Sequence, residues 1–177
     1  MPDTPLFRAG LLEGRVVAVF EAGPLGEATS AACRELGART PAFIPDEHEG
    51  SLDTLVIDAA GRFAAAPQDG LAPLRAAADD AWVAARAAAT AVMIDAPGGG
   101  KIVLLAPAPD AGAHAEATRA ALENMARTLS IEWARYDIRV TAIHPDASTP
   151  PADVAALVAY LASPAGDYFS GCVFSLS

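Results

Sequence analysis

The stretch HAEATRAALENMARTLSIEWARYDIRVTAIHP, from His114 to Pro145, decides how the rest of the chain is interpreted. Apolar residues recur in its first two thirds at three- and four-residue spacing, so they share one face of a helix. These residues are Leu122, Met125, Ala126, Leu129 and Trp133. Charges of alternating sign recur on another face, at Glu116, Arg119, Glu123 and Arg127. After a turn at Tyr136 and Asp137, an apolar run follows at 138–143. We therefore expect a long amphipathic helix that packs on a sheet, followed by a strand of that sheet.

The composition excludes several classes of protein. With 177 residues, the chain is long enough for one domain with a substantial core. Its net charge is −10 with only 12 Lys plus Arg, so it lacks the basic surface that nucleic acids or anionic membranes require. No apolar run reaches the roughly 18 residues of a membrane span, and the first residues do not read as a signal peptide. Cys33 and Cys172 are too few for a disulfide framework, and we expect a reduced, cytoplasmic setting.

Strands and helices are expected to alternate along the chain. Strand-like apolar runs lie at 16–20, 41–44, 54–57, 101–105, 138–143 and 172–176. Helical patterns lie at 26–36, 71–95, 113–135 and 152–162. This alternation predicts an α/β fold: a single Rossmann-like, doubly wound parallel sheet of about six strands with helices on both faces, in one domain over residues 1–177.

Five segments resemble, in the same order, the motifs of one known family. Residues 14–38 resemble a first strand, glycine loop and helix, and LDTLVIDAAG (52–61) resembles an LDxLVNNAG strand. GGGKIVLLAP (98–107) resembles the strand before a catalytic serine, and the stretch 114–145 resembles a YxxxK helix with its following strand. Residues 156–176 resemble the C-terminal helix and last strand. Through these motifs the chain is identified as a degenerate member of the short-chain dehydrogenase/reductase (SDR) family.

The resemblance also indicates where catalytic residues are missing. The family uses a tyrosine acid/base, a lysine four residues later, a serine and an asparagine. The tyrosine position falls on Ala115, the lysine position on Arg119, and the serine position on Ala106 or Pro107. Alanine cannot transfer a proton, and the only asparagine of the sequence, Asn124, lies inside the predicted helix. We therefore expect no catalytic residue at these positions, and no enzyme activity from this chain alone.

The glycine turn that would hold a cofactor is altered too. The family binds the cofactor pyrophosphate over a GxxxGxG turn at a helix N-terminus. Here Glu21 stands at the first glycine and Pro24 removes one N–H donor, whereas Gly23 and Gly26 remain. A carboxylate close to a diphosphate repels it by about 1–4 kcal/mol when partly screened. The remnant turn of Glu21, Gly23 and Gly26 is the candidate cofactor site, but we expect no cofactor here and NAD(P) in a catalytic partner.

The chain is also short for the family. Between the runs 41–44 and 54–57, where the family has a further helix and strand beside the adenine pocket, only a few polar residues remain. We therefore expect the sheet to be shortened at its cofactor-side edge. In this segment, Asp46 and Glu47 are either a mimic of the acidic residue that binds the adenosine ribose or solvated loop charges. The segment that carries the family's substrate loop, after 138–143, is equally brief.

The elements through which family members associate are complete. Members form dimers or tetramers through their two long central helices, here 71–95 and 113–135, and through the C-terminal helix and last strand. The candidate interface residues on these elements are Trp82, Val83, Arg86, Met93, Arg119, Glu123, Arg127, Tyr168 and Phe174. The aromatic residues among them, and Trp133, equally fit packing within the chain.

Two functions follow from this sequence. The first is a non-catalytic SDR-fold subunit, a pseudoenzyme that assembles with a catalytic SDR partner, or with itself, and stabilises or regulates the complex. The alternative is a divergent NAD(P)-dependent oxidoreductase, or a nucleotide or small-molecule binder, with a pocket rebuilt near Asp58, Asp110 and His144. The histidines have no metal-ligand spacing, and Cys33 reads as a small core residue. A fold alone does not choose between the two functions.

Overall fold

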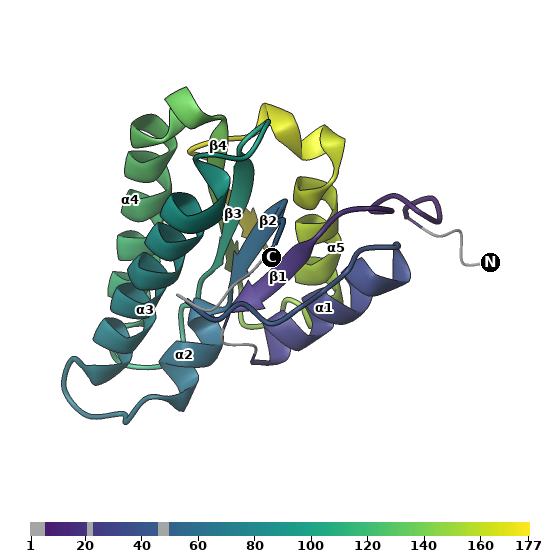
Figure 1. Cartoon of the computed structure of the whole chain (residues 1–177). Coiled ribbons are helices and arrows are strands. Elements are labelled where there is room, and N and C mark those ends of the chain that lie inside the picture. Colours follow the sequence, from purple (N-terminus) through teal and green to yellow (C-terminus); the bar gives the residue numbers. More distant parts are fainter. Residues whose placement is uncertain (1–5, 21–22, 46–49) are drawn as a thin grey trace, which may run out of the picture.

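The computed structural model describes residues 6–20, 23–45 and 50–177. Its strands form one five-stranded sheet in the order β1-β2-β3-β4-β5 (Figure 1). The strands are β1 (Val17–Phe20), β2 (Thr54–Ile57), β3 (Gly100–Leu105), β4 (Ile138–Pro145) and β5 (Val173–Leu176). All neighbouring pairs are parallel, so every strand ends at the same side of the sheet, which we call the carboxyl edge. The predicted parallel α/β sheet is confirmed.

The predicted strand at 41–44 accounts for the difference between six strands and five. It runs beside β1 and meets it through two isolated parallel bridges, at Arg39 and Ala42. The amides of Arg39 and Phe43 donate to carbonyls along the β1 side, whereas Pro41, midway between them, has no N–H. Because proline removes the central hydrogen bond, this segment is not a continuous strand of the sheet.

Helices cover both faces of the sheet, as predicted (Figure 1). One face carries α1 (Pro24–Glu35) and α5 (Pro151–Ala162), which pack against each other. The other face carries α2 (Ala59–Ala65), α3 (Ala72–Ala88) and α4 (Ala115–Glu132). Short turns follow three of the helices: η1 (Ala89–Met93), η2 (Ala134–Tyr136) and η3 (Pro164–Tyr168). In the part of the chain that is described, no helix combines the length and apolarity needed to cross a membrane.

Successive residues of a strand point alternately into the two hydrophobic cores, one on each face of the sheet. In β1, Ala18 and Phe20 belong to the core under α2, α3 and α4, whereas Val17 and Val19 belong to the core under α1 and α5. All four residues are buried. Because β1 is covered on both faces, apolar side chains are favoured at every one of its positions, which explains why it reads as an unbroken apolar run.

The two helices between β2 and β3 differ from the prediction. Helix α2 was not expected; it has only seven residues, too few to show a helical period, and its start is fixed by Asp58, whose side chain accepts a hydrogen bond from Gly61 N. The expected helix at 71–95 is α3, which ends at Ala88 and continues as the π-helical turn η1.

The helix and strand predicted from the stretch 114–145 are confirmed as α4 and β4. Leu122 and Ala126 are fully buried and Leu129 is 6% exposed, so the apolar stripe of α4 faces the sheet. Asp137 adopts a left-handed φ of 56° in the turn that joins the two elements. This conformation is one that Asp tolerates better than most residues do.

Candidate functional site

The first turn of α1 lies at the carboxyl edge, directly after β1. The amides of Gly23 and Gly26 both donate to Asp58 Oδ2, at 2.8 Å each. Gly61 N, in the first turn of α2, donates to Asp58 Oδ1 at 2.9 Å. One carboxylate therefore caps the amino ends of two helices, where backbone N–H groups and helix dipoles favour negative charge.

Asp58 has no exposed surface. Burial raises the pKa of its carboxyl group; the hydrogen bonds from Gly61, Gly26 and Gly23 oppose this rise, and the nearby charge of Glu27 adds to it. The N–H groups of Gly23 and Gly26 are already occupied by this internal anion. They are not free donors for an anion that arrives from solvent.

The turns before α1 and α2 pack backbone against backbone. A Cβ atom on Gly23 would lie 2.8 Å from Gly61 Cα, and a Cβ on Gly61 would lie 2.9 Å from Gly23 N. Real Cβ atoms do not approach other atoms so closely, so both positions need glycine. The glycine that survives at position 23 thus has a packing explanation that requires no ligand.

Arg119, in the second turn of α4, reaches the ends of two strands. Its Nη1 donates to Pro107 O and to Pro145 O, at 2.8 Å each. The side chain is 14% exposed, and Glu116 Oε1 lies 3.8 Å from its Nε. Because Pro107 follows β3 and Pro145 ends β4, the guanidinium group ties both strands to α4 at the carboxyl edge.

His144 lies beside this arginine, on β4. Its side chain is 7% exposed, and its Nε2 atom is buried with no hydrogen-bond partner in the described part of the chain. Burial lowers the pKa of the imidazole, the charge of Arg119 lowers it further, and the charges of Glu123 and Glu116 act in the opposite direction. The two largest influences, burial and Arg119, therefore favour the neutral form of the ring.

Neither a model of a known protein family nor a curated protein sequence matches this chain. Solved structures do. A short-chain dehydrogenase from Mycobacterium smegmatis matches with a TM-score of 0.78 and 24% identity, over 95% of this chain and 93% of the other. The citronellol catabolism dehydrogenase AtuB of Pseudomonas aeruginosa PAO1 matches with a TM-score of 0.75 and 21% identity, over 97% and 96%.

BdcA (YjgI) from E. coli matches with a TM-score of 0.72 and 22% identity, over 94% of this chain and all (100%) of the other. The chain has the short-chain dehydrogenase/reductase fold. At these identities the likeness is one of fold. The matches reach from 93% to 100% of the other chains, so they do not bear out the expected shortening at the cofactor-side edge, which stays a prediction.

On this SDR fold, the residues that the resemblance assigns to the tyrosine position (Ala115) and to the serine position (Ala106 or Pro107) are all buried. Ala115, in the first turn of α4, is 1% exposed, and Ala106, after β3, is fully buried. His114, directly before Ala115, adopts a φ of 152° and is the N-cap of α4. Its carbonyl accepts hydrogen bonds from the amide and the hydroxyl of Thr118. No group at these positions exchanges a proton.

The residues suggested for a rebuilt pocket are only partly brought together. Asp58 is bound to three backbone amides, as described above, and Asp110 is exposed in the loop after β3. His144 is close to Arg119, a residue that was not among those suggested for the pocket. The family resemblance placed Arg119 at the lysine position instead. Three other candidates, Glu21, Asp46 and Glu47, lie outside the described residues.

Most of the candidate interface residues reach the surface. Trp82 and Val83 are 43% and 45% exposed on the outer face of α3, and Arg86 is exposed one turn later. Arg127 and Glu123 form an ion pair of 2.8 Å on α4. Two more lie near the C-terminus: Tyr168 is 91% exposed, and the partly buried Phe174 stacks edge-on against Phe169 at 5.3 Å between ring centroids.

Met93 and Arg119 depart from that expectation. Met93 is fully buried, and a Cβ on Gly100 would lie 2.6 Å from its Sδ, so its side chain fills the space that this glycine leaves. Arg119 points inward to the two proline carbonyls. The helical spacing placed both residues on long helices but did not indicate that their side chains face the sheet.

Proposed function

We propose that this chain is a non-catalytic subunit with the SDR fold, a pseudoenzyme that assembles with a catalytic short-chain dehydrogenase/reductase and stabilises or regulates it. Hydride transfer and NAD(P) binding then belong to the partner. The observation that carries the proposal is the double capping by Asp58, whose carboxylate takes the amides of Gly23 and Gly26 at the start of α1.

The electrostatics at α1 support this proposal. A cofactor diphosphate placed at this turn meets a buried carboxylate instead of free N–H groups. Two unit charges of the same sign at about 4 Å repel by about 1–4 kcal/mol at effective dielectric constants between those of water and of a protein surface. Displacing Asp58 is also unfavourable, because a buried carboxylate without hydrogen bonds is costly.

The chemistry of the carboxyl edge supports it as well. Ala115 and Ala106 supply no proton donor, and Arg119 uses its guanidinium group to hold Pro107 and Pro145. Arginine keeps its proton at all relevant pH values, so it is not an acid/base catalyst. These side chains therefore stabilise the scaffold rather than a transition state.

Exposed apolar surface on α3 and α5 supports the proposal that the chain assembles with a partner. On α3, Trp82 and Val83 are exposed neighbours. On the other side of the sheet, an open apolar groove of about 580 Å³ lies along α5 and the end of β5. Its apolar lining includes Leu6, Phe7, Ala156, Leu157, Tyr160 and Leu176. Exposed aromatic and aliphatic patches of this kind favour protein contacts.

The test combines two measurements on the purified chain. Light scattering after size-exclusion chromatography gives its mass alone and after mixing with candidate catalytic SDR chains; we expect an assembly larger than a monomer. Trp82→Glu is expected to weaken the assembly, whereas Ile44→Glu, at a 51% exposed position at the far side of β1, is a matched control. A monomer at micromolar concentration under all these conditions contradicts the proposal.

The alternative is an NAD(P)-dependent oxidoreductase or a nucleotide or small-molecule binder. The observation that favours it is the buried, unpartnered Nε2 of His144 at the carboxyl edge. In addition, BdcA, which shares the fold at a TM-score of 0.72 and 20% identity, has been crystallised in complex with NADPH. Fluorescence titration with NADH and NADPH separates the two functions. Saturable enhancement supports the alternative, and an unchanged signal supports the non-catalytic subunit.

A further inference from the structure

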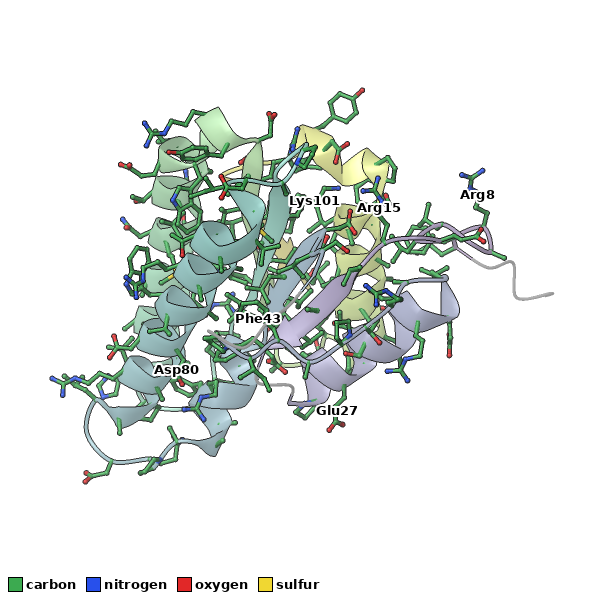
Figure 2. The ribbon with its side chains drawn as sticks, in the orientation of Figure 1. Arg8, Arg15, Glu27, Phe43, Asp80 and Lys101 are labelled. Carbon is green, nitrogen blue, oxygen red and sulfur yellow. The ribbon has the colours of Figure 1, made fainter. Side chains whose placement is uncertain are left out.

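A polar cleft of about 340 Å³ lies at the amino ends of the strands, on the opposite side of the sheet from the carboxyl edge. Its charged lining comprises Arg15, Asp53, Lys101, Asp137, Arg139 and Asp167. The three basic residues come from the starts of three parallel strands, β1, β3 and β4, which explains why they meet. Figure 2 shows Arg15 and Lys101 at the same end of the molecule.

These cations are close enough to influence one another. Burial lowers the pKa of Lys101; its ion pair with Asp167 opposes the change, and the charges of Arg15 and Arg139 add to it. The chain as a whole carries a net charge of −10 and only 12 basic residues. The cleft gathers three of these basic residues together with three aspartates, so its lining is formally neutral in an acidic chain.

The hydrogen bonds of the cleft show which cation is available. Lys101 Nζ is saturated: it contacts Leu161 O at 3.0 Å, Ser163 O at 2.6 Å and Asp167 Oδ1 at 2.7 Å. These contacts hold the carboxyl end of α5, where a cation is favourable. Lys101 thus has a structural role and no spare donor.

The two arginines do have spare donors. Arg15 uses Nη1 for Asp53 Oδ1 at 2.8 Å, and Asp53 Oδ2 is bound by Val16 N. Arg139 uses Nε for the carbonyl of Asp167 and Nη1 for that of Asp137, at 2.7 and 2.9 Å. Within the described residues, the Nη2 groups of both arginines make no hydrogen bond.

Glycines form the remaining wall. Gly98 and Gly99 have left-handed φ values of 88° and 65°. A Cβ on Gly99 would collide with the carbonyls of Tyr136 and Asp137, so the loop lies against the turn before β4. The two glycines add backbone but no side chain to the lining, to which Pro97 of the same loop also belongs.

We propose that this cleft binds a small oxyanion, the phosphate or carboxylate group of a small molecule, between the guanidinium groups of Arg15 and Arg139. The planar fork of N–H donors in arginine matches the oxygen atoms of such groups. The volume of the cleft is within the range of small-molecule sites, so a modest organic substituent fits beside the anion. The carboxylates of Asp53, Asp137 and Asp167 oppose an incoming anion, although Asp53 and Asp167 are already paired with Arg15 and Lys101. The attraction between the arginines and the anion is screened by salt, so the affinity is expected to fall as salt rises. This site is independent of the proposed SDR partner.

The test is an amide NMR titration of the whole chain with inorganic phosphate and, separately, with malonate. We expect saturable shifts at Gly98, Gly99 and Lys101 with at least one probe; the probe that binds more tightly identifies the phosphate or the carboxylate as the recognised group. Arg139→Gln is expected to weaken binding about tenfold, the effect of losing one charge-assisted hydrogen bond.

Two further variants keep the outcome unambiguous. Arg75→Gln removes the same charge from an exposed position on α3 and is expected to leave the affinity unchanged. Arg139→Lys retains the charge without the fork, so it is expected to lie between the wild type and Arg139→Gln, and it replaces that variant if Arg139→Gln does not fold. Shifts that never saturate with either probe, or equal affinities for the Arg139 and Arg75 variants, overturn the proposal.

Discussion

The carboxylate of Asp58 and the amide of Gly26 form a buried hydrogen bond of 2.8 Å between residues 32 positions apart. The same oxygen also binds Gly23, so the start of α1 is held by a side chain from the end of β2. The start of α1 lies at the carboxyl edge of the sheet, directly after β1. An internal anion therefore takes the position that elsewhere suits a bound one.

The first prediction concerns Asp58. Asp58→Ala leaves three amides without their acceptor, and we expect it to reduce the free energy of unfolding by about 3 kcal/mol. Asp58→Asn is expected to cost less, about 1–2 kcal/mol, because it retains one acceptor oxygen but turns a donor toward an amide. Urea unfolding measures both changes. Asp79→Asn, at an exposed position on α3, is the control; a loss for Asp58→Ala no larger than that of the control contradicts the capping role.

The second prediction concerns the dependence of stability on pH. The folded-state pKa of His144 is lowered from the ordinary value of 6.5, so the unfolded state binds its proton more strongly. The stability that the neutral ring contributes is fully present above pH 6.5 and is lost as the pH falls from there through the folded-state pKa. Urea unfolding at several values between about pH 7.5 and about pH 5.5, one unit on either side of the usual His pKa, measures this loss.

The matched variants for this pH dependence are His144→Gln and His114→Gln. His144→Gln is expected to flatten the decline, because glutamine does not titrate. His114 is partly exposed and lies outside the buried surroundings of His144, so His114→Gln should retain the slope of the wild type. The comparison uses slopes rather than absolute stabilities because His114 has a strained backbone. Equal slopes in all three proteins show that His144 is not responsible.

The third prediction concerns Arg119. Arg119→Lys preserves the charge but replaces a fixed fork by a flexible ammonium group, which we expect to hold the carbonyls of Pro107 and Pro145 less well. The expected loss in the free energy of unfolding is about 1–2 kcal/mol. Arg127→Lys on the same helix, where the side chain is 62% exposed, is expected to change it by less than about 0.5 kcal/mol. A loss no larger than that of this control shows that Arg119 does not stabilise the fold through the carbonyls of Pro107 and Pro145.

The fourth prediction concerns the two cysteines. Burial raises the pKa of Cys33 to about 12, whereas Cys172 is only partly buried. Since the thiolate is the reactive form, a thiol reagent at pH 8 should modify Cys172 quickly and Cys33 only after unfolding. Counting modified thiols by mass spectrometry, in native protein and in urea, tests this. Modification of both cysteines at similar rates in the native protein shows that Cys33 is not protected.

The sequence determined the features that depend on local pattern. The apolar runs identified all five strands, because most strand positions in a sheet with helices on both faces hold apolar side chains. The three- and four-residue spacing in 114–145 identified α4, because apolar residues at this spacing share the one helix face that packs on the sheet. Helix α2 is too short to show a helical period, so the sequence did not predict it. Pro41 lacks the N–H that would pair with β1, and the apolar pattern of 41–44 does not reveal this loss.

The tertiary structure alone decided what these residues do. The order and register of the parallel strands, which are separated by tens of residues in the sequence, decide these contacts. They decide which amides Asp58 caps, which carbonyls Arg119 holds and which cations meet at the amino ends of the strands. Spacing along the chain constrains neighbours within a helix or strand, because their geometry is fixed by the backbone. It does not constrain side chains from different strands, whose encounter is fixed only when the sheet is assembled.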